Sequence, residues 1–66
     1  MSTERNYKVT LRLEGEPMMT EYYETKAQAA DAFRRYVQTP ALVWIEVWDV
    51  RGEDSITRLW MFQNPA

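Results

Sequence analysis

The chain has 66 residues, enough for one small domain, and its 8 Lys and Arg against 10 Asp and Glu give a formal net charge of -2. It contains no Cys and no His, which excludes disulfides, thiolate zinc sites, thiol nucleophiles and histidine general bases. No apolar run approaches the roughly 20 residues of a membrane span, and the N-terminus lacks the hydrophobic stretch of a signal peptide.

The start of the chain predicts a β-hairpin. Residues 1–6 are polar, and we expect them to fray. Residues 7–13 alternate apolar and polar side chains, which is the period of a half-buried strand. Residues 14–17 contain Gly and Pro and predict a turn, and residues 18–24 are expected to form the return strand.

A helix is predicted next. Thr25 and Gln28 fit a capping box, and the Ala-rich segment after them favours a helix as far as Val37. Pro40 prevents its continuation. Residues spaced three and four apart define its buried stripe, which consists of Ala29, Ala30, Phe33, Tyr36 and Val37.

Two further strands are predicted, over residues 42–50 and 56–63, separated by a polar loop. In the first of them we expect one face to hold Val43, Ile45 and Val47 and the other to hold Trp44, Glu46 and Trp48. In the last strand Leu59 and Met61 are expected to face the helix, opposite Arg58, Trp60 and Phe62. Residues 64–66 are expected to fray.

The predicted order is therefore ββαββ, a single α+β domain over residues 1–66 with one helix packed on one face of a four-stranded sheet. If the third strand pairs with the first, the sheet order is 2-1-3-4 and every pairing is antiparallel. If it pairs with the second, a parallel step with a right-handed crossover results. We favour the antiparallel order, because such sheets can leave one face to water.

Little in the sequence indicates catalysis. The carboxylates have no His or Cys beside them, and the two glycines are isolated, so no phosphate-binding loop is present. The acidic stretch at residues 49–54 lacks the ligand spacing of a calcium loop. We therefore predict no catalytic residue, no metal site and no cofactor. The composition favours a soluble, cytoplasmic, non-enzymatic protein that acts by binding.

Acidic residues are concentrated in two segments. Residues 14–24 carry a net charge of -4 and residues 46–54 a net charge of -3, while the remainder is +5. The predicted topology brings four of these residues to one end of the sheet, namely Glu24, Asp49, Glu53 and Asp54. The other acidic candidates are Glu14, Glu16 and Glu21. These residues are either solvated loop positions or an anionic surface for a basic, DNA-reading groove of another protein.

The second candidate surface is aromatic and is formed by Trp44, Trp48 and Trp60 on the sheet face away from the helix. Near Arg12 and Arg58, these rings are either an interaction site or a small second core under arginine stems. Base stacking on the rings is a third reading. The low net charge disfavours it, so we expect no direct binding of nucleic acid.

The chain resembles small phage-encoded anti-CRISPR proteins in its length, its lack of Cys, its acidic turns and its single short helix. The segment 24–33 is similar to the lone helix of such proteins. The resemblance implies a monomeric inhibitor in the host cytoplasm. Such an inhibitor binds a cationic DNA-binding groove of a CRISPR–Cas effector subunit and blocks target DNA by local DNA mimicry. The alternative is a self-associating interaction module that buries the aromatic sheet face in a homodimer.

Overall fold

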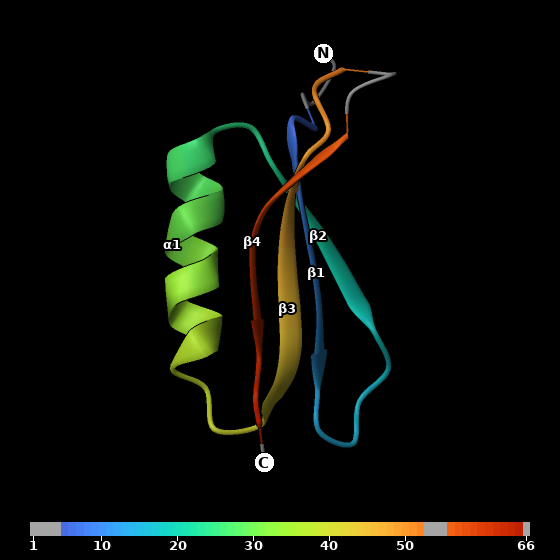
Figure 1. The fold of residues 1–66 in the computed structure, drawn as a ribbon, viewed down its shortest axis with the longest axis vertical. Coiled ribbons are helices and arrows are strands. Elements are labelled where there is room, and N and C mark those ends of the chain that lie inside the picture. The colour runs from blue at the N-terminus through green and yellow to red at the C-terminus, as the bar shows by residue number, and fades with distance from the viewer. Residues whose placement is uncertain (1–4, 53–55, 66) are drawn as a thin grey trace.

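The computed structural model describes residues 5–52 and 56–65 of the chain. Its five elements are β1 (Tyr7–Leu13), β2 (Met19–Tyr23), α1 (Lys26–Val37), β3 (Leu42–Asp49) and β4 (Thr57–Gln63). The strands form one sheet in the order β2-β1-β3-β4, and each neighbouring pair is antiparallel. Figure 1 shows α1 on one side of this sheet, and the described residues form no element on the other side. The predicted α+β fold and the antiparallel 2-1-3-4 order are confirmed.

The start of α1 is fixed by the predicted capping box. The Thr25 hydroxyl accepts a hydrogen bond from the Gln28 backbone N–H, and the Gln28 side-chain oxygen accepts one from the Thr25 backbone N–H, both at 3.2 Å. These bonds satisfy two backbone donors at the helix terminus. At the other end, Arg34 and Arg35 lie in the last turn, where cations complement the helix dipole.

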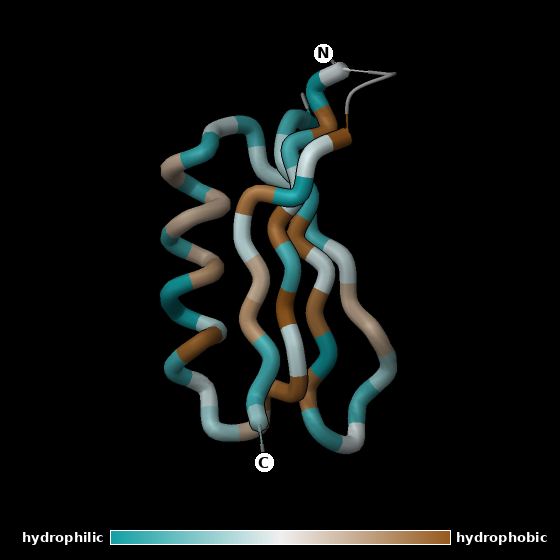
Figure 2. Tube along the Cα trace, in the orientation of Figure 1, coloured by the Kyte–Doolittle hydropathy of each residue, from teal (hydrophilic) through white to brown (hydrophobic). Residues whose placement is uncertain are grey.

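The core is a single apolar layer between α1 and the two central strands. Figure 2 shows hydrophobic and hydrophilic residues alternating along these strands. The largest side chains that are fully buried are Val9, Leu11, Ile45 and Val47. Each contributes about 1.5 to 3 kcal/mol on burial. Ala29 and Ala32 are also fully buried on the helix, so its backbone packs close to the sheet.

The predicted orientation of β4 is wrong at Trp60, Met61 and Phe62, whereas Leu59, which was also expected to face the helix, does pack against the core. Trp60 pairs with Val47 and Phe62 pairs with Ile45, both of which are fully buried, so these two aromatic residues face α1. The Trp60 ring lies 5.9 Å from the Phe33 ring. Met61 is 45% exposed on the opposite face. Both alternating sets of β4 are apolar, and the larger aromatic set takes the buried side.

An irregularity at each end of β3 adjusts the pairing. Arg12 pairs with Trp44 and Leu13 with Leu42, so Val43 has no cross-strand partner in β1. Leu42 is buried at this end of the core, and Val43 is only half-buried. Opposite β4 the register shifts between Val47 and Trp48, which leaves Leu59 as the extra residue of a bulge.

The two ends of the molecule are arranged as predicted. The end of β2, the start of α1 and the end of β3 lie at one end, and the turn between β1 and β2 lies at the other (Figure 1). That turn contains Gly15 at φ +80°, a backbone conformation that glycine adopts without strain. Asn6 and Asn64, in the segments expected to fray, both make hydrogen bonds. Within the described residues, no helix has the length and apolar character that a membrane crossing requires.

Candidate functional site: the open face of the sheet

The acidic end predicted from the sequence contains an internal ion pair. The Arg51 guanidinium donates to both carboxylate oxygens of Asp49, at 3.0 Å from Nε to Oδ1 and 2.8 Å from Nη2 to Oδ2. Hydrogen bonding to the Arg51 side chain and backbone holds the pKa of Asp49 below its ordinary value. The Asp49 charge is therefore compensated within its own loop. Glu53 and Asp54 lie outside the described residues.

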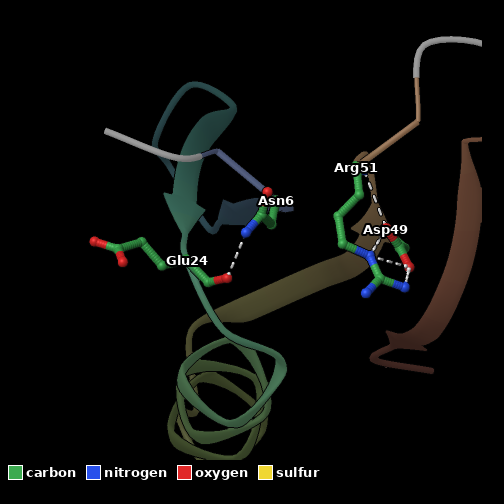
Figure 3. A network of polar contacts seen from close by, with 4 residues as sticks. All are labelled: Asn6, Glu24, Asp49 and Arg51. Atoms are coloured by element: carbon green, nitrogen blue, oxygen red, sulfur yellow. Dashed lines mark hydrogen bonds and ion pairs between the residues drawn. The ribbon is translucent and has the colours of Figure 1, made fainter. Parts of the chain in front are cut away.

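Glu24 lies at the same end but does not join Asp49. Figure 3 shows the Glu24 side chain directed away from Asp49 and Arg51, while its backbone carbonyl accepts a hydrogen bond from the Asn6 side chain at 2.9 Å. The positive charge of Lys26, two residues after Glu24, also contributes to lowering the pKa of Asp49, after the larger effect of the Arg51 hydrogen bonds. The two carboxylates described at this end, Glu24 and Asp49, thus lie among the cations Arg5, Lys26 and Arg51.

The other acidic candidates are separated from this end, and Glu21 is also separated from Glu14 and Glu16. Glu14 and Glu16 are exposed in the turn at the opposite end of the molecule. Glu21 is half-buried on the helix side of the sheet, where its carboxylate accepts hydrogen bonds from the Tyr23 and Tyr36 hydroxyls at 2.7 and 2.9 Å. The structure does not bring these three residues together with Glu24 and Asp49.

A different set of residues converges on the open face, which is the side of the sheet away from α1. Because side chains alternate along each strand, the residues between the core positions of β1, β2 and β3 point to this side. Cross-strand pairing arranges them in rows. One row consists of Tyr22, Lys8, Trp48 and Arg58. A second row consists of Thr20, Thr10, Glu46 and Met61. A third consists of Arg12, Trp44 and Gln63.

The open face is basic although the chain is acidic overall. Its cations are Arg5, Lys8, Arg12 and Arg58, and its one carboxylate is Glu46, counted over the three rows and Arg5. Arg58 forms an ion pair with Glu46 at 3.2 Å. In the described part of the chain, Arg5, Lys8 and Arg12 form no ion pair with a carboxylate. The positive charges of these three residues are thus not neutralised by the one carboxylate of the open face.

Two aromatic rings of the open face lie beneath guanidinium groups. The Arg58 guanidinium lies 5.9 Å from the centre of the Trp48 ring, and that of Arg5 lies 5.0 Å from the centre of the Tyr22 ring. Trp44 and Trp48 are both half-buried. Thr10 is only 7% exposed, so the side chains around it cover the middle of the sheet. The rings therefore form a packed layer with cations at its margin.

Trp60 does not belong to this layer. It was grouped with Trp44 and Trp48 from the sequence, but it faces α1, and its ring lies 5.7 Å from the Lys26 ammonium on the helix side. Lys8 and Arg12 occupy the face instead; Arg12 was expected near the rings, but neither residue was among the predicted site residues. Their signal was present, because they are polar positions of the alternating strand at residues 7–13.

The groups on this face are suited to ionic and apolar contacts with a ligand. Over residues 5–52 and 56–65, no group of three or more carboxylates is placed to hold a metal ion. The open face offers guanidinium and ammonium donors around apolar rings, which suits a ligand with carboxylates and apolar groups.

Comparison with known proteins does not add to this geometry. No protein-family model, no curated protein and no solved structure matches the chain. Proposals about function therefore depend on the site itself.

Proposed function

We propose that this protein is a non-enzymatic binding module whose open face docks an acidic segment of a partner protein. The observation that carries the proposal is a set of three cations, Arg5, Lys8 and Arg12, which form no ion pair with a carboxylate among the described residues. Lys8 and Arg12 lie opposite the half-buried Trp48 and Trp44, and Arg5 lies over the Tyr22 ring. Trp and Arg dominate binding energies at protein interfaces, and charge complementarity sets the choice of partner.

A protein partner is favoured over a single-stranded nucleic acid. Nucleic-acid platforms stack bases on free aromatic faces. Here guanidinium groups already lie over the rings of Trp48 and Tyr22. The chain as a whole is also negative, at -2, which disfavours a long polyanion but permits a short acidic segment.

Charge reversal on the open face tests the proposal. In a titration with a polyglutamate peptide followed by tryptophan fluorescence, we expect binding by the wild-type protein that weakens with added salt. The double variant Lys8→Glu/Arg12→Glu should lose this binding. The matched control is Arg34→Glu/Arg35→Glu, which makes the same charge change at exposed helix positions and should bind like the wild type.

Two outcomes reject the proposal. One is equal binding by the folded Lys8→Glu/Arg12→Glu variant and the wild type. The other is binding of a thymidine oligonucleotide more tightly than the peptide at the same salt concentration, which would indicate a nucleic-acid ligand.

The inhibitor implied by the anti-CRISPR resemblance is a second proposal. It is supported by Glu14, Glu16 and Glu24, which are exposed and form no ion pair within the described residues. In this proposal acidic side chains enter the DNA-reading groove of a CRISPR–Cas effector in the cytoplasm of a phage host. The partner is then basic, opposite in charge to the partner proposed for the open face.

The two proposals separate in one assay. Added to purified CRISPR–Cas effectors, an acidic inhibitor should block binding of target DNA, and Glu14→Lys/Glu16→Lys should abolish the block without unfolding the protein. Asp31→Lys, at an exposed helix position, is the matched control. Retained inhibition by the folded double variant rejects the acidic mechanism.

A further inference from the structure

The β4 edge presents backbone groups that no strand of the described chain pairs. The Asn64 N–H donates to the Val43 carbonyl at 3.0 Å, next to the opposed residues Gln63 and Trp44. Gln63 and Trp44 are therefore a non-hydrogen-bonded pair, and by the antiparallel alternation so are Met61 and Glu46. The N–H and C=O groups of Met61 and Gln63 thus point away from β3.

This edge lacks the features that usually prevent strands from pairing with another chain. Natural edges are protected by charges, proline or bulges. The bulge at Leu59 protects the start of β4, but residues 60–63 carry no charge and no proline. The one charged residue of β4 is Arg58, which is engaged with Glu46. The opposite edge, β2, is only five residues long and carries Glu21.

An apolar cavity of about 150 Å³ lies beside β4 on its helix side. Its lining consists of Ala30, Phe33, Arg34 and Trp60. The ring of Phe62, on the same side of β4, is half-buried. On the helix side of β4, Trp60 and Phe62 therefore extend the core to the edge of the sheet and leave part of their aromatic surface exposed.

We propose that a second copy of this chain pairs with β4 in antiparallel orientation, with Met61 opposite Met61 of the second copy. This register joins the outward hydrogen-bonding groups of Met61 in the two copies across a two-fold axis. It places Trp60 opposite Phe62 of the second copy, twice, on the helix side. Cross-strand aromatic pairs stabilise antiparallel strands.

A second copy fits this edge better than an unrelated strand, because the same residues of both chains supply the backbone hydrogen bonds and the aromatic pairs in this register. No like charges face each other, since Arg58 falls opposite Asn64 of the second copy. The product is one continuous sheet with both open faces on one side and both helices on the other. This inference is independent of the function proposed for the open face.

Cysteine cross-linking tests the register. The chain has no Cys, so Met61→Cys introduces a single thiol. Residues opposed in a hydrogen-bonded antiparallel pair lie about 5.5 Å apart at Cα, within the range for a disulfide. We expect mild oxidation to give a covalent dimer of Met61→Cys. The control is Thr20→Cys, an exposed position on the other edge strand, which should stay monomeric.

Sedimentation of cysteine-free protein gives the second measurement. We expect a concentration-dependent dimer that Met61→Lys weakens by about tenfold, because two lysines then face each other at the axis. Thr20→Lys should leave the dimer unchanged. A wild-type protein that stays monomeric at high concentration overturns the proposal. So does a dimer that survives Met61→Lys and is lost on Trp44→Ala, since this result assigns the interface to the open face.

Discussion

The Glu21 carboxylate joins two elements by accepting hydroxyl hydrogen bonds from Tyr23 on its own strand and from Tyr36 on α1. Burial, reinforced by the hydrogen bond to Glu21, raises the pKa of Tyr23 to about 12. The pKa of Tyr36 is raised by the same causes in the same order. The folded state therefore binds the phenolic protons more tightly than the unfolded chain does.

This coupling predicts a loss of stability at alkaline pH. Because the folded pKa of Tyr23 exceeds its unfolded value of about 10, its contribution is complete below pH 10 and is lost as the pH rises through about 12. Urea denaturation across this range should show a fall in the free energy of unfolding. Tyr23→Phe/Tyr36→Phe should flatten the fall, and Tyr22→Phe, on the open face, should not. Identical profiles for all three proteins would contradict this account.

At the residue scale, the sequence predicts local interactions and misses those made across space. The capping box of Thr25 and Gln28 is predicted because its partners are three residues apart. The hydrogen bond from the Tyr36 hydroxyl to Glu21 joins residues 15 apart in sequence, and no periodicity indicates it. The carboxylate of Glu21 was therefore assigned to an acidic surface, although it is bonded under α1.

At the element scale, β4 shows where hydrophobic alternation stops being informative. Strict alternation groups Trp60 with Phe62 and Leu59 with Met61, and both sets are apolar. The period of two identifies a strand but does not choose its face. In β1 apolar residues alternate with polar ones, and in β3 one alternating set contains the β-branched residues Ile45 and Val47. The predicted faces are confirmed, because Val9, Ile45 and Val47 are fully buried.

The orientation of β4 has a mutational consequence. Trp60→Ala removes a ring packed on Phe33, and we expect it to lower the free energy of unfolding by about 2 kcal/mol. Met61→Ala removes a side chain that is 45% exposed, and its cost should stay within about 0.5 kcal/mol. Urea denaturation at low protein concentration measures both. A larger cost for Met61→Ala than for Trp60→Ala would reverse the assignment of the two faces.

At the scale of the whole molecule, the small core leaves little reserve of stability. A domain of this size has a free energy of unfolding of about 5 kcal/mol. Ile45 is fully buried, and Ile45→Ala is expected to cost about 2 to 5 kcal/mol. This leaves a free energy of unfolding of at most about 3 kcal/mol, so circular dichroism should show a protein that unfolds at low urea concentration. Ile45→Val, at about 0.5 to 1.5 kcal/mol, should stay folded with a lowered denaturation midpoint. A native spectrum and midpoint for Ile45→Ala would show that the core is larger than this layer.

The overall fold could be predicted because topology follows from the order of elements and from the single helix, which covers one face only. The charge distribution could not. Net charges of segments say nothing about which side of a strand a residue occupies, and Lys8 and Arg12 reach the open face only because Val9 and Leu11 fill the core. Segment charges therefore indicated the acidic ends, and the basic face between them becomes apparent only when the alternation of residues 7–13 is combined with the cross-strand pairing.

The pairing of β1 with β3 has a consequence for how the chain folds. It is the one place where the hairpin of β1 and β2 meets the hairpin of β3 and β4 among the described strands. Each hairpin closes a short loop and can form within microseconds. The pairing of β1 with β3 is slower, because β3 lies beyond the helix in the sequence and a longer loop must close. Nucleation of the native state thus depends on a search between two preformed halves, and α1 is the tether that limits how far they can separate.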